Sequence, residues 1–508
     1  MSAVPRVTEL ANALTAGLDA ATPVELVRLL ACADAQLFTG SHGLPGAYEH
    51  AAELSRVASQ IALTLQHPRG RIVFGGCGTS GRIAHLLAAA YNARQGGEAH
   101  PRFHYLLAGG DAALLIPAES VEDSAEAGAG DFAAWEARCG VAPEDPVVLI
   151  GISCGLSATF VASLLTAGLQ RPRCFSVAMG FNALPAVAAV AVPGAGITFH
   201  SVLQALLAQP SRAAVLNPVV GPEAVAGSSR MKGGSATWIL CTAMCEEALG
   251  TMAAPNPVTM QGRLLQVEGV VRALYASSTA ALACLVQDGA RALACPAAPA
   301  PAASAAAAEE YAPSPPATGR VFLLGGGLAG LWGCVDASEA TDTYGSAFGD
   351  LRGFVAGGWG CMAVQAGAGD PEVPLELRGR GPRGEAPPAG AARASPCLSS
   401  FVRHIAPTLT PSDLVVALGI GNFTLERDAE LLGEAVRAAH SRGAAVRYLL
   451  VEEVMPAPAT SSYFSELVSL CSASATASAS SGSSAGVHVR LWELLPGLPA
   501  SSIPWAAC

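Results

Sequence analysis

Lysine is almost absent from this chain of 508 residues: Lys232 is the only one, and arginine supplies the rest of the 29 basic side chains. The 40 acidic side chains outnumber them and give a formal net charge of −11. Nucleic acids and anionic membrane surfaces recruit proteins through extended basic faces. The charge balance therefore argues against both as partners, while a local basic pocket could still hold a small phosphate.

Charged residues are scarce as well, at 14% of the chain against roughly 25% in an average soluble protein, whereas 51% are hydrophobic. This composition indicates a globular protein with a surface of small, largely neutral residues. The 14 cysteines form no CxxC pair and no zinc-like spacing, which excludes the common zinc-site patterns. We expect reduced, mostly buried thiols, no metal ion and no cofactor.

The sequence also lacks a recognisable targeting or membrane segment. Residues 1–17 carry Arg6 and Glu9 and no apolar core of the kind found in secretory signals. The best candidate for a long apolar run, residues 184–197, is interrupted by two prolines. We therefore expect a soluble intracellular protein, cytoplasmic or nuclear.

Short apolar segments, predicted as strands, alternate with helical segments through most of the chain. Such alternation is typical of a doubly wound α/β fold with a largely parallel sheet, whose ligands bind at the carboxyl ends of the strands. The predicted strands are residues 71–74, 103–107, 146–150 and 174–179 in the first half and 320–324, 414–418 and 446–451 in the second.

The chain divides into four predicted parts. Thr22 as N-cap and Pro23 at the first helical position mark a helix in the N-terminal region. The pattern of strand, glycines and helix at residues 71–93 recurs at 320–338, which suggests two similar domains fused in one chain. The parts are a helical segment 1–65, an α/β domain 66–294, an Ala/Pro-rich linker 295–318 and a second α/β domain 319–508.

The strongest local signal is the glycine-rich turn GGCGTSGR at residues 75–82, between a strand and a helix. Gly78 permits close backbone approach, and the hydroxyls of Thr79 and Ser80 with helix N-terminal amides can cradle a phosphate or sugar hydroxyls. The glycines also match GxGxxG, but Asp111 comes too late to be the ribose-binding acid of a dinucleotide site, expected about 20 residues on. An ordinary glycine-rich turn is the alternative.

Two further turns carry hydroxyls and can converge with the first at one end of a parallel sheet. They favour a small anionic ligand such as a phosphorylated sugar. Arg230 and Lys232 could supply charge to it or could instead pair with structural acids. The candidate residues of these turns are Ser153, Cys154, Gly155 and Ser157 in one, and Ser228, Ser229, Arg230 and Lys232 in the other.

Three acids, Glu119, Glu122 and Asp123, follow the second predicted strand near the same sheet end. A carboxylate there could hold sugar hydroxyls or act as a general base. It could equally be a helix N-terminal acid favoured by the helix dipole.

Residues 217–237, which include NP, GPE and GSSRMKGGSAT, resemble a signature of the sugar isomerase (SIS) domain family. Within that family the signature is shared by glucokinase regulatory protein and the bacterial N-acetylmuramic acid 6-phosphate etherases, and the similarity extends from Thr8 to about Leu495. Residues 151–158, 180–182 and 350–354 are more similar to the regulatory branch, as is the presence of a second, fused domain.

The resemblance implies two doubly wound SIS domains in a pseudo-dimer that binds a phosphorylated sugar, with fructose phosphates as the regulatory family's ligands and a glucokinase-type partner. Glu122 would hold sugar hydroxyls in a regulator or serve catalysis in an etherase. The other ligand residues it implies are Gly78, Thr79, Ser80, Ser153, Cys154, Gly155 and Ser157 together with the signature residues Ser228, Ser229, Arg230 and Lys232.

Departures from the family pattern favour a binding protein over an enzyme. Ala90 stands where the etherases have a second acid, and the second domain's turn at 325–330 has no hydroxyl. Glu339 lies in a segment that resembles the sequence around that acid, so we hypothesise that it reaches into the first domain's site; a surface acid on the second domain's first helix is the alternative. The alternative function is therefore an etherase that removes lactate with Glu122 and Glu339. Relative to the regulatory family the second domain looks truncated, and Pro496 replaces an aromatic of the kinase-binding surface.

Overall fold

The computed structural model describes residues 5–95, 101–114, 121–187, 198–253, 258–294, 319–344, 346, 349–358, 396–420, 426–452 and 486–490. They form two compact units. The first comprises residues up to Ala20 and Arg28–Arg272, and the second comprises Ala21–Val27 and the described residues from Ala273 onward. The predicted linker 295–318 and the segment around Pro496 lie outside the described residues, and the four-part division of the chain stays a prediction.

The first unit is built on a five-stranded, all-parallel sheet of order β2-β1-β3-β4-β5. Both faces of a parallel sheet are covered by helices, which is why these strands are almost continuously apolar and buried. The strands are β1 Arg71–Gly76, β2 Phe103–Leu107, β3 Val147–Ile152, β4 Cys174–Met179 and β5 Ala213–Leu216.

Helices connect and cover these strands, except that α1 and α8 are each divided between the two units, and some helix ends carry clear caps. Thr22 and Glu25 hydrogen-bond one another at the start of α1, as the sequence predicted for this helix start, and Ser124 accepts a bond from Ala127 N–H at the start of α4. Gly140 ends α4 in a left-handed conformation. The helices are α1 Pro23–Thr39, α2 Ala51–Gln66, α3 Gly78–Arg94, α4 Ala125–Cys139, α5 Thr159–Gln170, α6 Phe199–Leu207, α7 Lys232–Ala253 and α8 Met260–Ala294.

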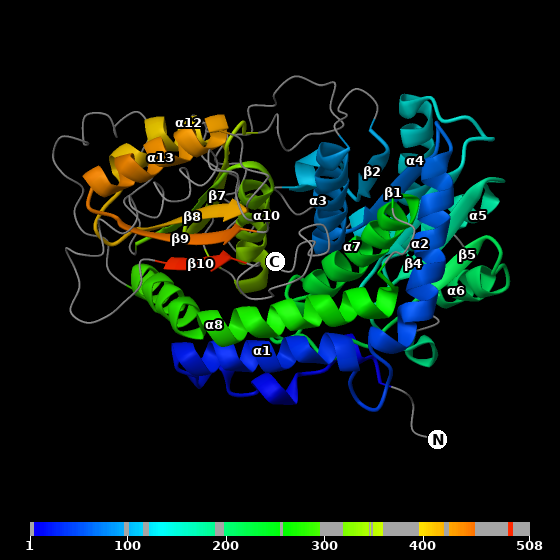
Figure 1. Ribbon diagram of the computed structural model, residues 1–508, viewed down its shortest axis with the longest axis horizontal. Coiled ribbons are helices and arrows are strands. Elements are labelled where there is room, and N and C mark those ends of the chain that lie inside the picture. The colour runs from blue at the N-terminus through cyan, green and yellow to red at the C-terminus, as the bar shows by residue number, and fades with distance from the viewer. Residues whose placement is uncertain are drawn as a thin grey trace. The chain divides into compact units, whose positions relative to one another are not determined.

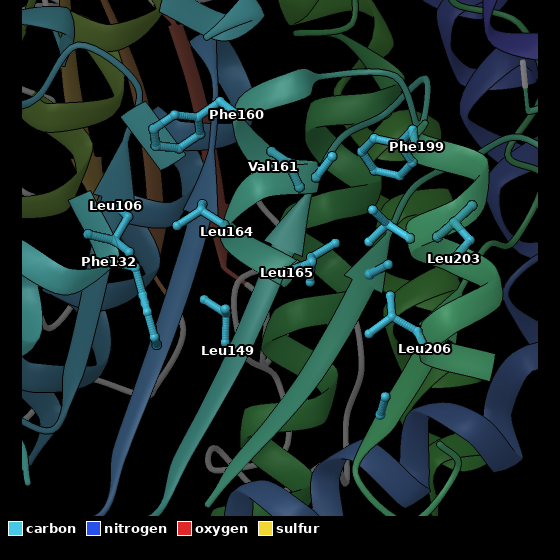
Figure 2. Packing of buried hydrophobic residues seen from close by; sticks show 14 of the residues in the cluster. Leu106, Phe132, Leu149, Phe160, Val161, Leu164, Leu165, Phe199, Leu203 and Leu206 are labelled. Carbon is cyan, nitrogen blue, oxygen red and sulfur yellow. The ribbon is translucent and has the colours of Figure 1, made fainter. Parts of the chain in front are cut away.

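A hydrophobic core fills the space between this sheet and the helices on one of its faces (Figure 2). Phe160 and Leu164 of α5 and Leu203 of α6 have no exposed surface and pack with Leu149 of β3. Burying each such side chain stabilises the fold by about 1.5–3 kcal/mol. The core fixes where α5 begins, and hence the turn between β3 and α5.

The second unit repeats the first (Figure 1). Its parallel sheet has the order β7-β6-β8-β9-β10, which in order of appearance along the chain is the same 2-1-3-4-5 arrangement. The doubly wound α/β class and the internal repeat predicted from the sequence are confirmed. The elements are β6 Val321–Gly325, α10 Gly327–Tyr344, β7 Leu351–Val355, α12 Leu398–Ser400, β8 Leu414–Ile420, α13 Glu426–Ser441, β9 Ala445–Glu452 and β10 Gly486–Arg490.

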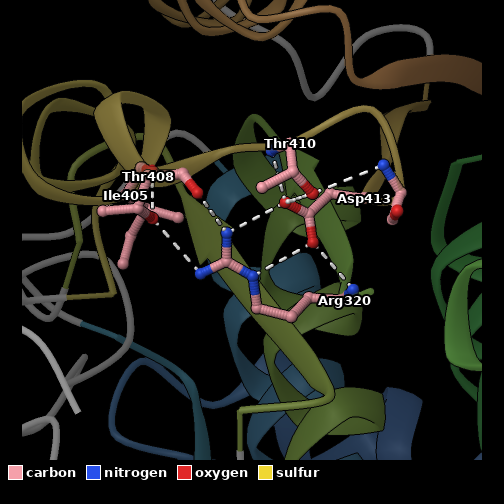
Figure 3. Close-up of polar contacts among 6 residues, drawn as sticks. Arg320, Ile405, Thr408, Thr410 and Asp413 are labelled. Carbon is pink, nitrogen blue, oxygen red and sulfur yellow. Dashed lines mark hydrogen bonds and ion pairs between the residues drawn. The ribbon is translucent and has the colours of Figure 1, made fainter. Parts of the chain in front are cut away.

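An arginine and an aspartate form an ion pair at the amino end of each sheet. Arg320, just before β6, donates three hydrogen bonds to Asp413, just before β8, whose carboxylate also accepts two from Thr410 (Figure 3). In the first unit Asp145, which precedes β3, lies 2.9 Å from the guanidinium of Arg69, which precedes β1. The repeat therefore extends to the polar contacts that join the first and third strands.

Helix α8 (Met260–Ala294) is, within the described part of the chain, the one helix long and apolar enough to cross a membrane by length and composition. The sequence prediction counted uninterrupted apolar runs and did not single it out, because polar residues interleave its apolar ones. A single such helix is weak evidence of a membrane span.

Candidate functional site

The strand order of the first unit fixes where a ligand can bind. The chain leaves β1 towards β2 on one side and leaves β3 towards β4 on the other. In open α/β sheets such a reversal opens a crevice at the carboxyl ends of the two strands. The glycine-rich turn follows β1 and the Ser153–Ser157 turn follows β3, so both predicted turns border this crevice.

The glycine-rich turn is compact because two glycines touch. A Cβ on Gly81 would lie 2.5 Å from the Gly76 carbonyl oxygen, which is too close for any side chain at this position. Gly78 has φ +48° and begins α3, so Thr79 and Ser80 lie in the first turn of that helix. Unpaired amides at a helix start attract anions, and these two hydroxyls lie beside them.

The turn after β3 is shaped by its own first residue. The Ser153 hydroxyl oxygen accepts hydrogen bonds from the backbone N–H groups of Ser157, at 3.0 Å, and of Ala158, at 3.2 Å. Leu156 is buried with φ 53°, a strained conformation for a side-chain-bearing residue. Cys154 Sγ lies 3.6 Å from Ser80 Oγ and so joins this turn to the glycine-rich turn.

The signature loop (residues 217–237, which lead from β5 into α7) completes the group of three turns. A Cβ on Gly233 would lie 3.3 Å from Cys154 Sγ, and one on Gly234 would lie 3.6 Å from Thr79 Cγ2. The Ser228 hydroxyl is buried and has no hydrogen-bond partner among the described residues. The structure therefore brings together the three turns that the sequence singled out.

A buried carboxylate holds the signature loop in shape. Glu223 accepts hydrogen bonds from the backbone N–H groups of Lys232, at 2.8 Å, and Gly233, at 2.9 Å, at the start of α7. Burial raises the pKa of Glu223 to about 7, because the charged form is poorly solvated there. Glu223 therefore occupies the first backbone amides of α7.

Lys232 contacts α1 through its side chain. Its side chain is 1% exposed, and Nζ donates to Gln36 Oε1 at 2.6 Å and to the Ala33 carbonyl at 3.2 Å, both on α1. Burial lowers the pKa of the Lys232 ammonium to about 8. Lys232 is therefore hydrogen-bonded to groups of α1 in this structure. In the same loop Ser229 is exposed and Arg230 is half-buried.

The N-terminal segment makes hydrogen bonds to the site that were not predicted from the sequence. Asn182 exchanges two hydrogen bonds with Thr8 and donates to the Gly155 carbonyl. Asn12 donates to the Pro222 carbonyl at 2.9 Å. These contacts connect the turn after β3 and the signature loop to the same short N-terminal segment. The sequence feature that could have indicated them is the Gly-Phe-Asn motif at residues 180–182, which contains Asn182.

The candidate acids are placed only in part. Glu122 lies in the short helix Val121–Asp123 after β2, and the structure describes its backbone alone, while Glu119 lies outside the described residues. Ala90 is buried in α3, and Glu339 is half-buried on α10 of the second unit. The hypothesis that Glu339 reaches the first unit's site stays a prediction.

We expect Cys154 to resist alkylation at pH 8, because burial raises its pKa to about 11 and the thiolate is the reactive form. Cys32 is exposed and provides the internal reference. Peptide mass spectrometry after timed treatment of native protein with iodoacetamide measures both rates. Equal labelling of the two cysteines would show that the turns around Cys154 are open.

Two doubly wound parallel sheets of order 2-1-3-4-5, one of them with a glycine-and-hydroxyl turn at its strand reversal, form the arrangement expected of two SIS domains. A family model described as the glucokinase regulatory protein N-terminal SIS domain matches residues 56–169. The rat glucokinase regulatory protein is 30% identical over 475 residues, which cover 90% of this chain and 68% of that protein. The chain belongs to the glucokinase regulatory protein family.

The frog (Xenopus laevis) regulatory protein is also 30% identical, over 85% of this chain, and the chain spans 64% of that relative's length. The N-acetylmuramic acid 6-phosphate etherase of Rubrobacter xylanophilus is 34% identical over 45% of this chain and 64% of the enzyme. Among solved structures, tagatose-6-phosphate ketose/aldose isomerase from Escherichia coli superposes with a TM-score of 0.46 and 15% identity, over 88% of this chain and 85% of that one.

Proposed function

We propose that this chain binds a phosphorylated sugar of the fructose phosphate type in the first unit and acts in the cytoplasm as a non-catalytic regulator of a glucokinase-type enzyme. The observation that carries the proposal is the junction of three hydroxyl-bearing turns at the strand reversal, where Cys154 contacts Ser80 and Gly233 lies beside Cys154. Membership of the regulatory protein family supports the choice of ligand and partner.

In this proposal each of the three turns contacts a different part of the ligand. The start of α3, with Gly78, Thr79 and Ser80, receives the phosphate, because helix N-terminal amides and hydroxyls favour anions. The exposed hydroxyl of Ser229 is available to the ligand, and beside it lies the buried hydroxyl of Ser228, which has no hydrogen-bond partner among the described residues. The remaining proposed contacts are Glu122, Ser153, Cys154, Gly155, Ser157 and Arg230.

The main test is a calorimetric titration of the full chain with fructose 1-phosphate, fructose 6-phosphate, sorbitol 6-phosphate and N-acetylmuramic acid 6-phosphate. We expect at least one fructose or sorbitol phosphate to bind, and Ser80→Ala to weaken binding at least about tenfold, since a hydrogen bond to a charged group contributes about 1.5–3 kcal/mol. Ser59→Ala, at an exposed position on α2, is the matched control and should bind normally. If Ser80→Ala left the affinity unchanged, the phosphate would not bind at the start of α3 as proposed.

The etherase relatives supply the second candidate function, in which Glu122 and Glu339 act as the acids. Ala90 argues against it, because the first unit lacks a second acid at that position. Lactate release from N-acetylmuramic acid 6-phosphate distinguishes the two functions: none is expected, and turnover that Glu122→Gln abolishes would establish the enzyme instead. Inhibition of a glucokinase in the presence of the bound sugar phosphate tests the proposed partner.

A further inference from the structure

The chain's single lysine sits at an unusual place for a charged group. Lys232 begins α7, yet its side chain is 1% exposed and its ammonium bonds to α1 through Gln36 and Ala33. Burying an ammonium is costly unless it is hydrogen-bonded, so these contacts must be maintained for the charge to remain there. The lysine therefore fixes the distance between α7 and α1.

The contact is specific for the slim head group of lysine. Gly221 has φ +87°, and a Cβ there would lie 2.9 Å from Lys232 Nζ and 2.7 Å from Gln36 Oε1. Gln36 Oε1 also accepts a hydrogen bond from Asn12 Nδ2 at 3.1 Å, which holds the amide in place. A planar guanidinium is wider than an ammonium and would have to displace some of these atoms.

The same residue also shapes the ligand-facing side of the loop through its main chain. The Lys232 and Gly233 N–H groups hold the Glu223 carboxylate, and Gly233 lies against Cys154 of the neighbouring turn. Displacement of the start of α7 would therefore move two of the three turns apart. Side chain and main chain of one residue connect α1 to the crevice.

We propose that Lys232 is a positioning residue, which touches no ligand and holds the signature loop in its binding shape by tying the start of α7 to Gln36 and Ala33. This inference rests on the proposed sugar-phosphate site. It departs from the interpretation of Lys232 as a ligand contact, and the two interpretations differ in what the free protein shows.

The first test measures the reactivity of the ε-amino group, which is unique in this chain. Native protein is treated with formaldehyde and a borohydride reductant, with and without 10 mM fructose 1-phosphate, and methylation of Lys232 is followed by peptide mass spectrometry; protein in guanidinium chloride gives the unprotected rate. The proposal expects Lys232 to be protected at least about a hundredfold in the native protein already without ligand, as for a group exposed only on unfolding, and bound ligand adds protection only by stabilising the native state. A lysine that reacts in the free protein and is protected by the sugar phosphate would overturn it.

The second test compares ligand affinity and stability among variants. Lys232→Met and Gln36→Leu should each weaken sugar-phosphate binding about tenfold or more, and the double variant should be no weaker than the worse single one, because both remove the same contact. Gln36→Glu keeps an acceptor for the ammonium and should bind as the unaltered chain does. Arg272→Met, which removes a positive charge from a 75% exposed side chain, is the charge control.

The outcomes separate this inference from the proposed function. Additive losses in the double variant, or full affinity in Lys232→Met, would overturn the positioning role while sugar-phosphate binding stands. Failure of the unaltered chain to bind any sugar phosphate of the panel would overturn the proposed function. If Lys232→Met does not fold, the methylation of the unaltered protein still decides between a positioning residue and a ligand contact.

Discussion

Replacement of Gly81 by alanine is expected to abolish sugar-phosphate binding and to destabilise the first unit by about 3 kcal/mol, near the upper end of typical costs for overpacked cores. The added Cβ would lie 2.3 Å from Leu107 Cδ1 and 2.5 Å from the Gly76 carbonyl oxygen. The leucine can rotate away, but the backbone oxygen cannot, so β1 and the start of α3 must separate. Calorimetric titration and denaturant unfolding measure the two losses.

Gly130→Ala is the matched control for this variant. Gly130 lies within α4, and nothing lies within 4 Å of a Cβ added there. Alanine should therefore stabilise the helix by roughly 0.5–1 kcal/mol without changing ligand affinity. A Gly81→Ala variant that is as stable as Gly130→Ala and binds sugar phosphate would show that the turn is not closed as described.

Asp413→Ala is expected to destabilise the second unit by about 3–5 kcal/mol, the range for breaking a buried ion pair from one side. The Asp413 carboxylate is 1% exposed in its side chain and accepts hydrogen bonds from Arg320 and Thr410. Its removal leaves a 14% exposed guanidinium and several N–H groups without their acceptor. Urea unfolding followed by circular dichroism measures the change.

Two comparisons make the Asp413 result specific. Glu434→Ala removes an exposed acid of α13 and should change stability by no more than about 0.5 kcal/mol. The double variant Asp413→Leu/Arg320→Met should recover part of the loss, because it leaves no unpaired charge. If the double variant lost as much stability as the single variants Asp413→Leu and Arg320→Met together, the broken ion pair would not be the cause of the loss.

The sequence predicted the class of fold well because its main signal is local. Long apolar segments such as β3 and β8 appear in the sequence as strands, and the capping pair Thr22–Glu25 marks the start of α1. Three strands, β5, β7 and β10, were not predicted. β5 is apolar but has only four residues, and β7 carries Arg352 as its second residue and is only partly buried, so neither shows the long apolar pattern of a central strand.

The candidate site was predicted where its signal was carried by turns and missed where it was carried by distant contacts. The three hydroxyl-bearing turns were recognised from their glycines and serines. The direction of Lys232 depends on Gln36, 196 positions away in the chain, and the anchoring of the turn after β3 depends on Thr8 and Asn182, 174 positions apart. No spacing within a motif reveals pairings of this kind.

The arginine–aspartate pairs and the hydroxyl-bearing turns lie at opposite ends of their strands. Asp145 and Asp413 act before β3 and β8 begin, whereas Ser80 and Cys154 act after β1 and β3 have ended. Cohesion and recognition are therefore spatially separate properties of this architecture. Loops at the carboxyl edge could therefore be exchanged to change ligand specificity while the contacts at the amino edge keep the strands in register. The second unit shows the same scaffold with different loops, since its turn at residues 325–330 has no hydroxyl.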